Sequence, residues 1–153
     1  MSATARERFA AMSAKLKASG LKSTPQRLAV MKLLAESKGH PSVDDIRARL
    51  QKKFPGISQA TVYRTIQLAK SLGEAYEIAF AGGGSRYDGR KPHPHPHIVC
   101  LACGRIIDPE LRSLGEMTRE IAAASGFAIT TFRLDFFGLC PACRNNKNGS
   151  RKT

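Results

Sequence analysis

Residues 58–73, SQATVYRTIQLAKSLG, decide the fold. Ser58 is a favoured N-cap residue and Gly73 is typical of the position just past a helix end, so a helix is expected between them. Its apolar stripe at helical spacing consists of Val62, Ile66, Ala69 and Leu72. Its outer polar face consists of Gln59, Thr61, Arg64, Thr65 and Gln67. Such side chains hydrogen-bond base edges and phosphates, which predicts the recognition helix of a DNA-binding domain.

The segments on either side of this helix predict a winged helix-turn-helix. Upstream, residues 1–19 form a basic helical pattern, Thr24-Pro25 begins a second helix and Ser42 caps a third. Downstream, residues 75–81 and 85–88 flank three glycines, as in a β-hairpin with a glycine-rich tip. From these patterns alone, the alternative is a plain helical bundle whose polar face is simply solvated.

The second half of the chain predicts a small α/β unit. Alternating Pro and His over residues 91–97 indicate a hinge. The strands are expected at 98–101, 105–108 and 127–139, with a helix at 110–125. The fold class is therefore α+β, with a DNA-binding domain at 1–90, a dimerisation and metal-binding domain at 91–143 and a disordered basic tail at 144–153. With so few residues to form a core, this unit needs a metal, a second copy of the chain, or both for its stability.

Charge separates the same two halves. The chain of 153 residues has a net charge of +13. Residues 1–90 hold 16 basic and 7 acidic residues, whereas residues 91–143 hold five of each. A polyanionic partner for the first half explains this better than a solvated surface does. No stretch is long and apolar enough for a membrane span or a secretory signal, so we expect a cytoplasmic protein with reduced thiols and no membrane partner.

All four cysteines lie in two Cys-x-x-Cys knuckles, Cys100 with Cys103 and Cys140 with Cys143. Four thiolates at this spacing predict a closed, structural Zn²⁺ site that would join the last strand to the first hairpin. The alternatives are a redox dithiol pair or two disulfides. Cys140-Pro141 also matches a haem-binding pair, but the knuckle already accounts for both residues.

The histidines suggest a second metal site. His93, His95 and His97 alternate with prolines, and residues two apart in an extended segment point the same way. His95 and His97 can therefore chelate one ion, the alternative being a low-complexity linker. The zinc-deaminase pattern is excluded, because the His-x-Glu motif is absent.

Taken together, the motifs resemble the ferric uptake regulator family of metal-dependent repressors, and most closely its peroxide-sensing subgroup. The resemblance runs from about Lys17 to Cys143. The matching stretches are Gly20-Leu21-Lys22-x-Thr24-x-x-Arg27, His40-Pro41-x-x-Asp44-Asp45-Ile46, Ala60-Thr61-Val62-Tyr63-Arg64-Thr65, His95-x-His97-x-x-Cys100-x-x-Cys103-Gly104 and Gly138-x-Cys140-x-x-Cys143. The resemblance implies a homodimer that binds palindromic double-stranded DNA when a divalent metal occupies a site between its two domains.

The resemblance also implies a regulatory ligand set, consisting of His40, Asp88, His95, His97 and Asp108. Imidazoles and carboxylates without a thiolate suit Fe²⁺ or Mn²⁺. Iron-uptake regulators of the family commonly have Glu where this chain has its two Asp, so the Asp pair indicates a peroxide sensor in which His40 or His95 is oxidised. The family's additional metal site often uses a histidine at the position of Phe132, so that site is not expected here. We expect His93 to be a neutral histidine outside the regulatory metal site and not one of its ligands.

For DNA, the resemblance places Tyr63 on a base, Arg64 on a base or phosphate and Lys22 in the minor groove. Lys15, Lys17 and Arg27 would add phosphate contacts. The main expected interface is Lys22, Arg27, Ser58, Gln59, Thr61, Tyr63 and Arg64. The alternatives are an iron- or manganese-responsive repressor with no peroxide response, and a metal-storage or delivery protein. An enzyme is not expected, because the thiolate site is closed and no nucleophile–base pair or small organic substrate is indicated.

Overall fold

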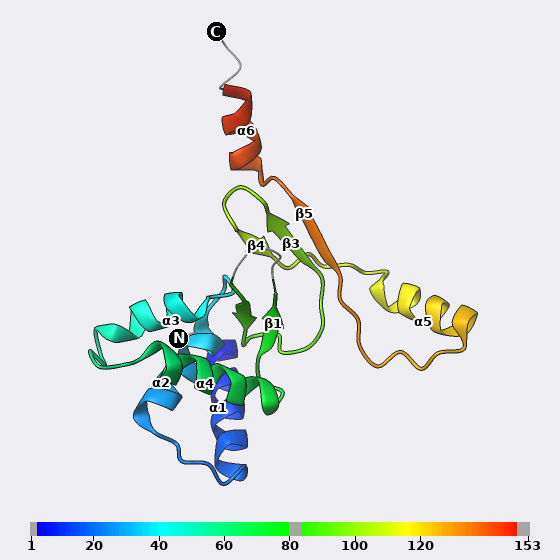
Figure 1. Ribbon diagram of the computed structural model, residues 1–153. Helices are drawn as coiled ribbons and strands as arrows, with labels where there is room; N and C mark the ends of the chain where they lie inside the picture. The colour runs from blue at the N-terminus through cyan, green and yellow to red at the C-terminus, as the bar shows by residue number, and fades with distance from the viewer. Residues whose placement is uncertain (1–2, 80–83, 150–153) are drawn as a thin grey trace. The chain divides into compact units, whose positions relative to one another are not determined.

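The computed structural model describes residues 3–79 and 84–149. The chain divides into two compact units, Met1–His93 and Pro94–Thr153. The elements in chain order are α1 (Ala3–Ala18), α2 (Pro25–Glu36), α3 (Val43–Gln51), α4 (Gln59–Ser71), β1 (Tyr76–Ile78), β2 (Arg86–Asp88), β3 (His97–Cys100), β4 (Ile106–Ile107), α5 (Leu114–Ser125), β5 (Asp135–Gly138) and α6 (Pro141–Gly149) (Figure 1). Within the described ranges, no helix combines the length and apolar character needed to cross a bilayer.

The three predicted N-caps of the first unit are confirmed. The hydroxyl of Thr24 accepts the backbone N–H of Arg27 at 3.3 Å, and that of Ser58 accepts the N–H of Thr61 at 3.1 Å. Ser42 forms a full capping box with Asp45, in which each side chain accepts the other residue's backbone N–H. Each cap contributes about 1 kcal/mol to helix stability. The helix-turn-helix segment is therefore set locally, by residues that the sequence displays directly.

The core of the first unit lies between α1, α2 and α4. Its fully buried side chains include Met12, Leu16, Val30, Met31, Leu34, Val62 and Ile66. The predicted stripe of α4 is confirmed, with Leu72 partly buried at its end. Thr65 was expected on the outer polar face, but it is only 2% exposed and its hydroxyl donates to the Thr61 carbonyl at 2.8 Å. At 3.6 residues per turn, position 65 lies on the same face of the helix as Val62 and Ala69. Because threonine is polar, the residue type alone does not predict that this position is buried.

The predicted wing is an antiparallel hairpin in which Tyr76 pairs with Asp88 and Ile78 with Arg86. Ion pairs attach each of its strands to a helix. Lys70 of α4 binds Glu77 of β1. Arg86 of β2 binds Asp45 of α3 at 2.6 Å. Gly82 and Gly83 of the predicted tip lie outside the described residues.

The second unit holds a three-stranded sheet in the order β4-β3-β5. β4 runs antiparallel to β3, whereas β5 runs parallel to it. The long strand expected over 127–139 is wrong, because only Asp135–Gly138 is strand. β-propensity is expressed only where a neighbouring strand supplies hydrogen bonds, and β3 is four residues long. The predicted helix also begins late, at Leu114 rather than at residue 110.

The disordered tail expected from residue 144 is not seen in the part that the structure describes. Helix α6 starts at Pro141 and continues to Gly149. Proline favours the first helical position, and the Arg144 N–H closes the first turn on the Cys140 carbonyl at 2.9 Å. The polar composition concealed this helix, because its start is set by the second cysteine knuckle. Residues 150–153 of the predicted tail lie outside the described residues.

Candidate metal centres and DNA-facing surface

The four cysteines of the second unit form one cluster. Their sulfur atoms all lie within 4.8 Å of one another, and those of Cys103 and Cys140 are 3.8 Å apart. Zn–S bonds of about 2.3 Å in a tetrahedron place the sulfurs about 3.8 Å apart, so the cluster fits Zn²⁺. No disulfide joins these four residues. The end of β3 and the start of α6 supply the two knuckles, and the Cys140 N–H donates to the Cys100 sulfur at 3.3 Å.

Hydrogen bonds shift the pKa values of two of these thiols in opposite directions. The N–H groups of Cys140 and Cys103 point at the Cys100 sulfur and lower its pKa to about 6. The Cys143 pKa is raised to about 12, because this thiol donates to the sulfurs of Cys140 and Cys103. Cys100 is therefore a ready thiolate at neutral pH, whereas Cys143 must lose a proton to bind a metal.

In the first unit, a buried histidine meets a buried aspartate. Nε2 of His40, in the loop before α3, lies 3.4 Å from Oδ2 of Asp88, at the end of β2. The other oxygen of Asp88, Oδ1, accepts the backbone N–H groups of Arg90 and Lys91 at 2.6 and 3.0 Å. The loop is attached to β2 by the Tyr87 N–H, which donates to the Pro41 carbonyl at 3.1 Å. This pair is therefore prearranged within its own unit.

In the second unit, His95, His97 and Asp108 offer ligand atoms that lie within 4.8 Å of one another. The two imidazole rings are 4.4 Å apart, and Nε2 of His95 lies 3.6 Å from Oδ1 of Asp108. Two ligands that are each about 2.1 Å from one ion, at right angles, lie about 3.0 Å apart, so small movements would bring these atoms onto a divalent cation. Imidazole and carboxylate donors suit Fe²⁺ or Mn²⁺. His93 is exposed and lies outside this group.

One residue near this group carries no signal in the sequence pattern. Oδ1 of Asp135, on β5, lies 3.3 Å from Nδ1 of His97. The only signal that could have found it is the parallel register of β3 with β5, which pairs these two residues. Short sequence patterns do not predict the register of strands so far apart in the chain.

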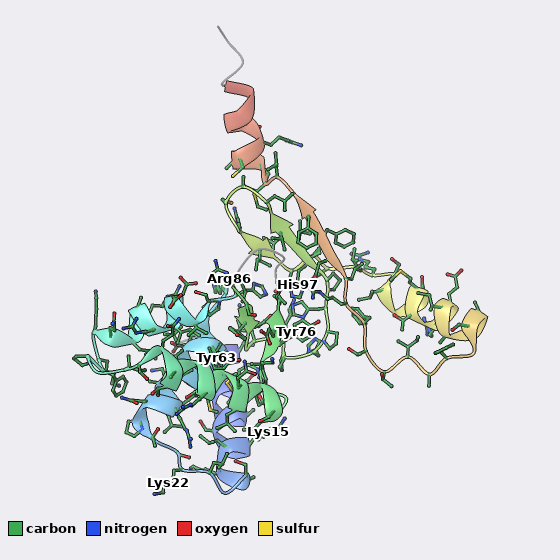
Figure 2. The ribbon with its side chains drawn as sticks, viewed as in Figure 1. Lys15, Lys22, Tyr63, Tyr76, Arg86 and His97 are labelled. Atoms are coloured by element: carbon green, nitrogen blue, oxygen red, sulfur yellow. The ribbon has the colours of Figure 1, made fainter. Side chains whose placement is uncertain are left out.

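The expected DNA-reading residues cluster on the first unit. Tyr63 of α4 is 50% exposed, and Arg64 beside it is exposed as well. Figure 2 labels Tyr63 on α4 and Lys22 on the loop between α1 and α2. A hollow of about 510 Å³ is lined by residues from this loop, α2 and α4, namely Gly20, Leu21, Lys22, Thr24, Arg27, Thr61, Arg64 and Thr65. Three of these side chains are cationic, so the hollow suits a backbone phosphate.

Several of the expected DNA contacts also have partners inside the protein. The Gln59 side chain donates to Asp44 at 3.1 Å. Arg27 donates to the Lys22 carbonyl at 2.9 Å, which holds the loop against α2. Ser58 caps α4. These residues therefore shape the surface whether or not they touch DNA.

A family model described as the ferric uptake regulator family matches residues 18–137. The chain belongs to this family. It is similar to the "Peroxide-responsive repressor PerR" of Staphylococcus epidermidis, with 36% identity over 135 residues that cover 88% of this chain and 89% of the relative.

Solved structures agree with this membership. A peroxide stress regulator of Campylobacter jejuni is 31% identical, with a TM-score of 0.69 over 84% of this chain and 96% of the other. The ferric uptake regulator of Vibrio cholerae is also 31% identical, with a TM-score of 0.70 over 82% and 96% of the two chains. These likenesses confirm the predicted α+β fold.

Proposed function

We propose that this family member is a homodimeric, metal-dependent DNA-binding repressor that responds to hydrogen peroxide. The observation that carries the proposal is that aspartate supplies both carboxylates of the expected ligand set, each beside a buried imidazole. Asp88 lies against His40, and Asp108 lies against His95. Similarity to several proteins named peroxide-responsive repressors supports the same conclusion.

The regulatory ligands of the proposal are His40 and Asp88 from the first unit with His95, His97 and Asp108 from the second. Binding one Fe²⁺ or Mn²⁺ with all five would couple the two units and set the separation of the two recognition helices in a dimer. A dimer reads two half-sites related by two-fold symmetry, so this separation determines affinity. The metal thereby becomes a condition for DNA binding.

DNA binding itself is assigned to the basic first unit. The exposed side chains of Tyr63 and Arg64 would read bases, and Lys22 and Arg27 would contact the backbone or the minor groove. Phosphate contacts release counterions, so affinity should fall steeply with salt. A palindromic operator follows from two-fold symmetry.

The second copy is assigned to the exposed apolar side chains of the second unit. Its exposed large apolar side chains are Ile98, Leu101, Ile107, Leu111, Met117, Ile121, Phe127, Ile129, Phe136, Phe137 and Leu139. So many exposed apolar groups in one small unit are typical of an association surface. The near-zero charge of residues 91–143 removes the repulsion that a basic unit would have for its twin.

The four-cysteine cluster is assigned to Zn²⁺ with a structural role, because a closed thiolate site has no open position for substrate. Fe²⁺ held at the histidine–aspartate site would activate the peroxide O–O bond, and the two electrons that reduce this bond would come from the imidazole. In the net reaction, one oxygen atom of H₂O₂ inserts into a C–H bond of His40 or His95 and the other leaves as water. The imidazole loses two electrons, and its altered ring no longer fits the ligand set. The reaction consumes the protein's own side chain, so no enzymatic turnover is proposed.

The decisive experiment is mass spectrometry of the Fe²⁺-loaded protein after exposure to H₂O₂. We expect one added oxygen on a peptide containing His40 or His95, together with loss of binding to a duplex selected from a random pool. The matched control is the Mn²⁺-loaded protein, which should bind the same duplex and stay unmodified. If the iron form stays unmodified and remains bound, the peroxide response is wrong and the protein is a metal-uptake repressor. A storage or delivery protein would select no duplex under any metal.

A further inference from the structure

The last strand of the second unit brings a carboxylate to the back of one proposed ligand. In the parallel register, His97 of β3 pairs with Asp135 of β5, and the His97 N–H donates to the Leu134 carbonyl at 3.0 Å. Oδ1 of Asp135 lies 3.3 Å from Nδ1 of His97. Figure 2 labels His97, whose side chain is 1% exposed. The ring is therefore buried with one nitrogen facing a carboxylate.

The carboxylate is itself held in place. Its second oxygen, Oδ2, accepts a hydrogen bond from Nε of Arg133. The Asp135 side chain is 8% exposed, whereas that of Arg133 is largely in solvent. Arg133 thus compensates a charge that would otherwise be costly to bury, and it keeps the carboxylate from rotating. The carboxylate bridges the guanidinium on one side and the imidazole on the other.

We propose that Asp135 is a positioning residue for the regulatory metal site, acting through His97. A carboxylate beside Nδ1 favours the tautomer that carries its hydrogen there, which presents the Nε2 lone pair to a metal and makes it more basic. This inference rests on the proposed role of His97 as a ligand. Among the described residues, Asp135 lies outside the group of ligand atoms that contains His95, His97 and Asp108, so it acts behind the ring and does not bind the ion itself.

The test is Asp135→Asn, which keeps the side chain's shape but removes its charge. The new amide can turn its NH₂ group toward Nδ1, which would place the ring hydrogen on Nε2 and block the ligand. We expect the affinity for Mn²⁺ to fall about 10- to 100-fold. This affinity is measured by titrating Mn²⁺ into protein whose cysteine site holds Zn²⁺ and following the electron paramagnetic resonance signal of the unbound Mn²⁺. We also expect ¹⁵N NMR of the imidazoles, without regulatory metal, to show the hydrogen on Nδ1 of His97 in the wild type and a shift toward Nε2 in the variant.

Three controls make the result specific. Glu116→Gln removes an exposed acidic charge from α5 of the same unit and should leave Mn²⁺ affinity unchanged. Zinc content and thermal unfolding show whether Asp135→Asn has damaged the fold. His97→Ala tests the ligand assignment itself, since retained Mn²⁺ affinity in that variant would overturn the proposed function.

The inference can fail while the proposed function stands. That is the result if His97→Ala loses Mn²⁺ but Asp135→Asn binds it like the wild type. A His97 hydrogen found on Nε2 in the wild-type protein also overturns the inference, and this measurement needs no variant. Loss of Mn²⁺ affinity together with the tautomer shift supports it, because a merely structural defect would not move the ring hydrogen.

Discussion

At the residue scale, the loop that holds His40 is under local strain. His40 has a φ of +48°, in the left-handed region that non-glycine residues enter at a cost of about 1–2 kcal/mol. The hydrogen bond from Tyr87 to Pro41 and the capping box that starts at Ser42 hold this conformation. Strain that persists because the surroundings fix it is typical of functional positions. It agrees with the role proposed for His40.

Asp45 provides a test at the same scale. Its carboxylate accepts the Ser42 N–H at 2.9 Å and binds Arg86, and these contacts lower its pKa below the ordinary value of 3.8. Because the folded pKa is the lower one, its stabilising effect is full above 3.8 and disappears as pH falls through the folded pKa. Asp45→Asn should therefore lower the free energy of unfolding by about 1 kcal/mol at neutral pH, a value kept small because the side chain is partly exposed.

Chemical denaturation of both proteins at neutral pH and at about pH 3 measures this effect. The gap between wild type and variant should narrow at the lower pH. Asp44→Asn is the matched control, since Asp44 has no part in the capping box and should show a smaller effect. A gap of equal size at both pH values would show that the charge of Asp45 contributes nothing.

At the element scale, close packing positions the end of the wing. A Cβ on Gly89 would lie 2.7 Å from Cβ of Leu34 and 2.9 Å from the terminal carbon of Met12. Arg8 of α1 donates to the Gly89 carbonyl at 3.0 Å and also binds the buried Glu74, just before β1. Helices α1 and α2 therefore determine where β2 ends, and Asp88 is its last residue.

Gly89→Ala tests this packing. The added methyl group should force α2 or β2 to move and destabilise the first unit by about 1–3 kcal/mol. It should also weaken Mn²⁺ binding, because Asp88 would move with the strand. Thermal unfolding and Mn²⁺ titration measure the two effects. Gly39→Ala, in the same unit and with open space around its Cβ, is the control. Equal behaviour of the two variants would contradict the packing argument.

At the scale of the whole molecule, the two units differ in how they are stabilised. The first has a continuous apolar core that includes Met12, Met31 and Ile66. In the described part of the second, the buried apolar residues are only Pro96, Val99, Cys100 and Ile106. So small a core does not offset the entropy of ordering the chain, so we assign the remaining stabilisation to the thiolate cluster and the proposed second copy.

Removal of zinc should therefore affect the two units unequally. We expect a strong chelator to convert the dimer to a monomer and to expose residues 94–149 to protease, while the helices of the first unit remain folded. Analytical ultracentrifugation, limited proteolysis and far-ultraviolet circular dichroism follow these changes. The untreated protein and protein reloaded with Zn²⁺ are the controls. A zinc-free dimer that resists protease would show that the cysteine cluster does not stabilise the second unit.

Local signals in the sequence predict much of the first unit correctly. Thr24, Ser42 and Ser58 begin helices because their side chains satisfy N–H groups a few residues away, and this chemistry is visible in any short window. The two Cys-x-x-Cys knuckles predict the thiolate cluster from equally short stretches of sequence. Thr65 was misplaced because residue type concealed a buried position. The length of β5 and the helix after Pro141 were missed because each depends on a distant partner, β3 in one case and the cysteine cluster in the other.

The sequence by itself therefore determined where the capped helices of the first unit begin, the charge division between the halves and the donor types available to each metal. These properties belong to single residues or to neighbours along the chain. Only the tertiary structure decided that Asp88 faces His40, that Gly89 packs against Leu34 and that Asp135 lies behind His97. Such pairs are separated by tens of residues, and the register and packing that join them are properties of the folded chain.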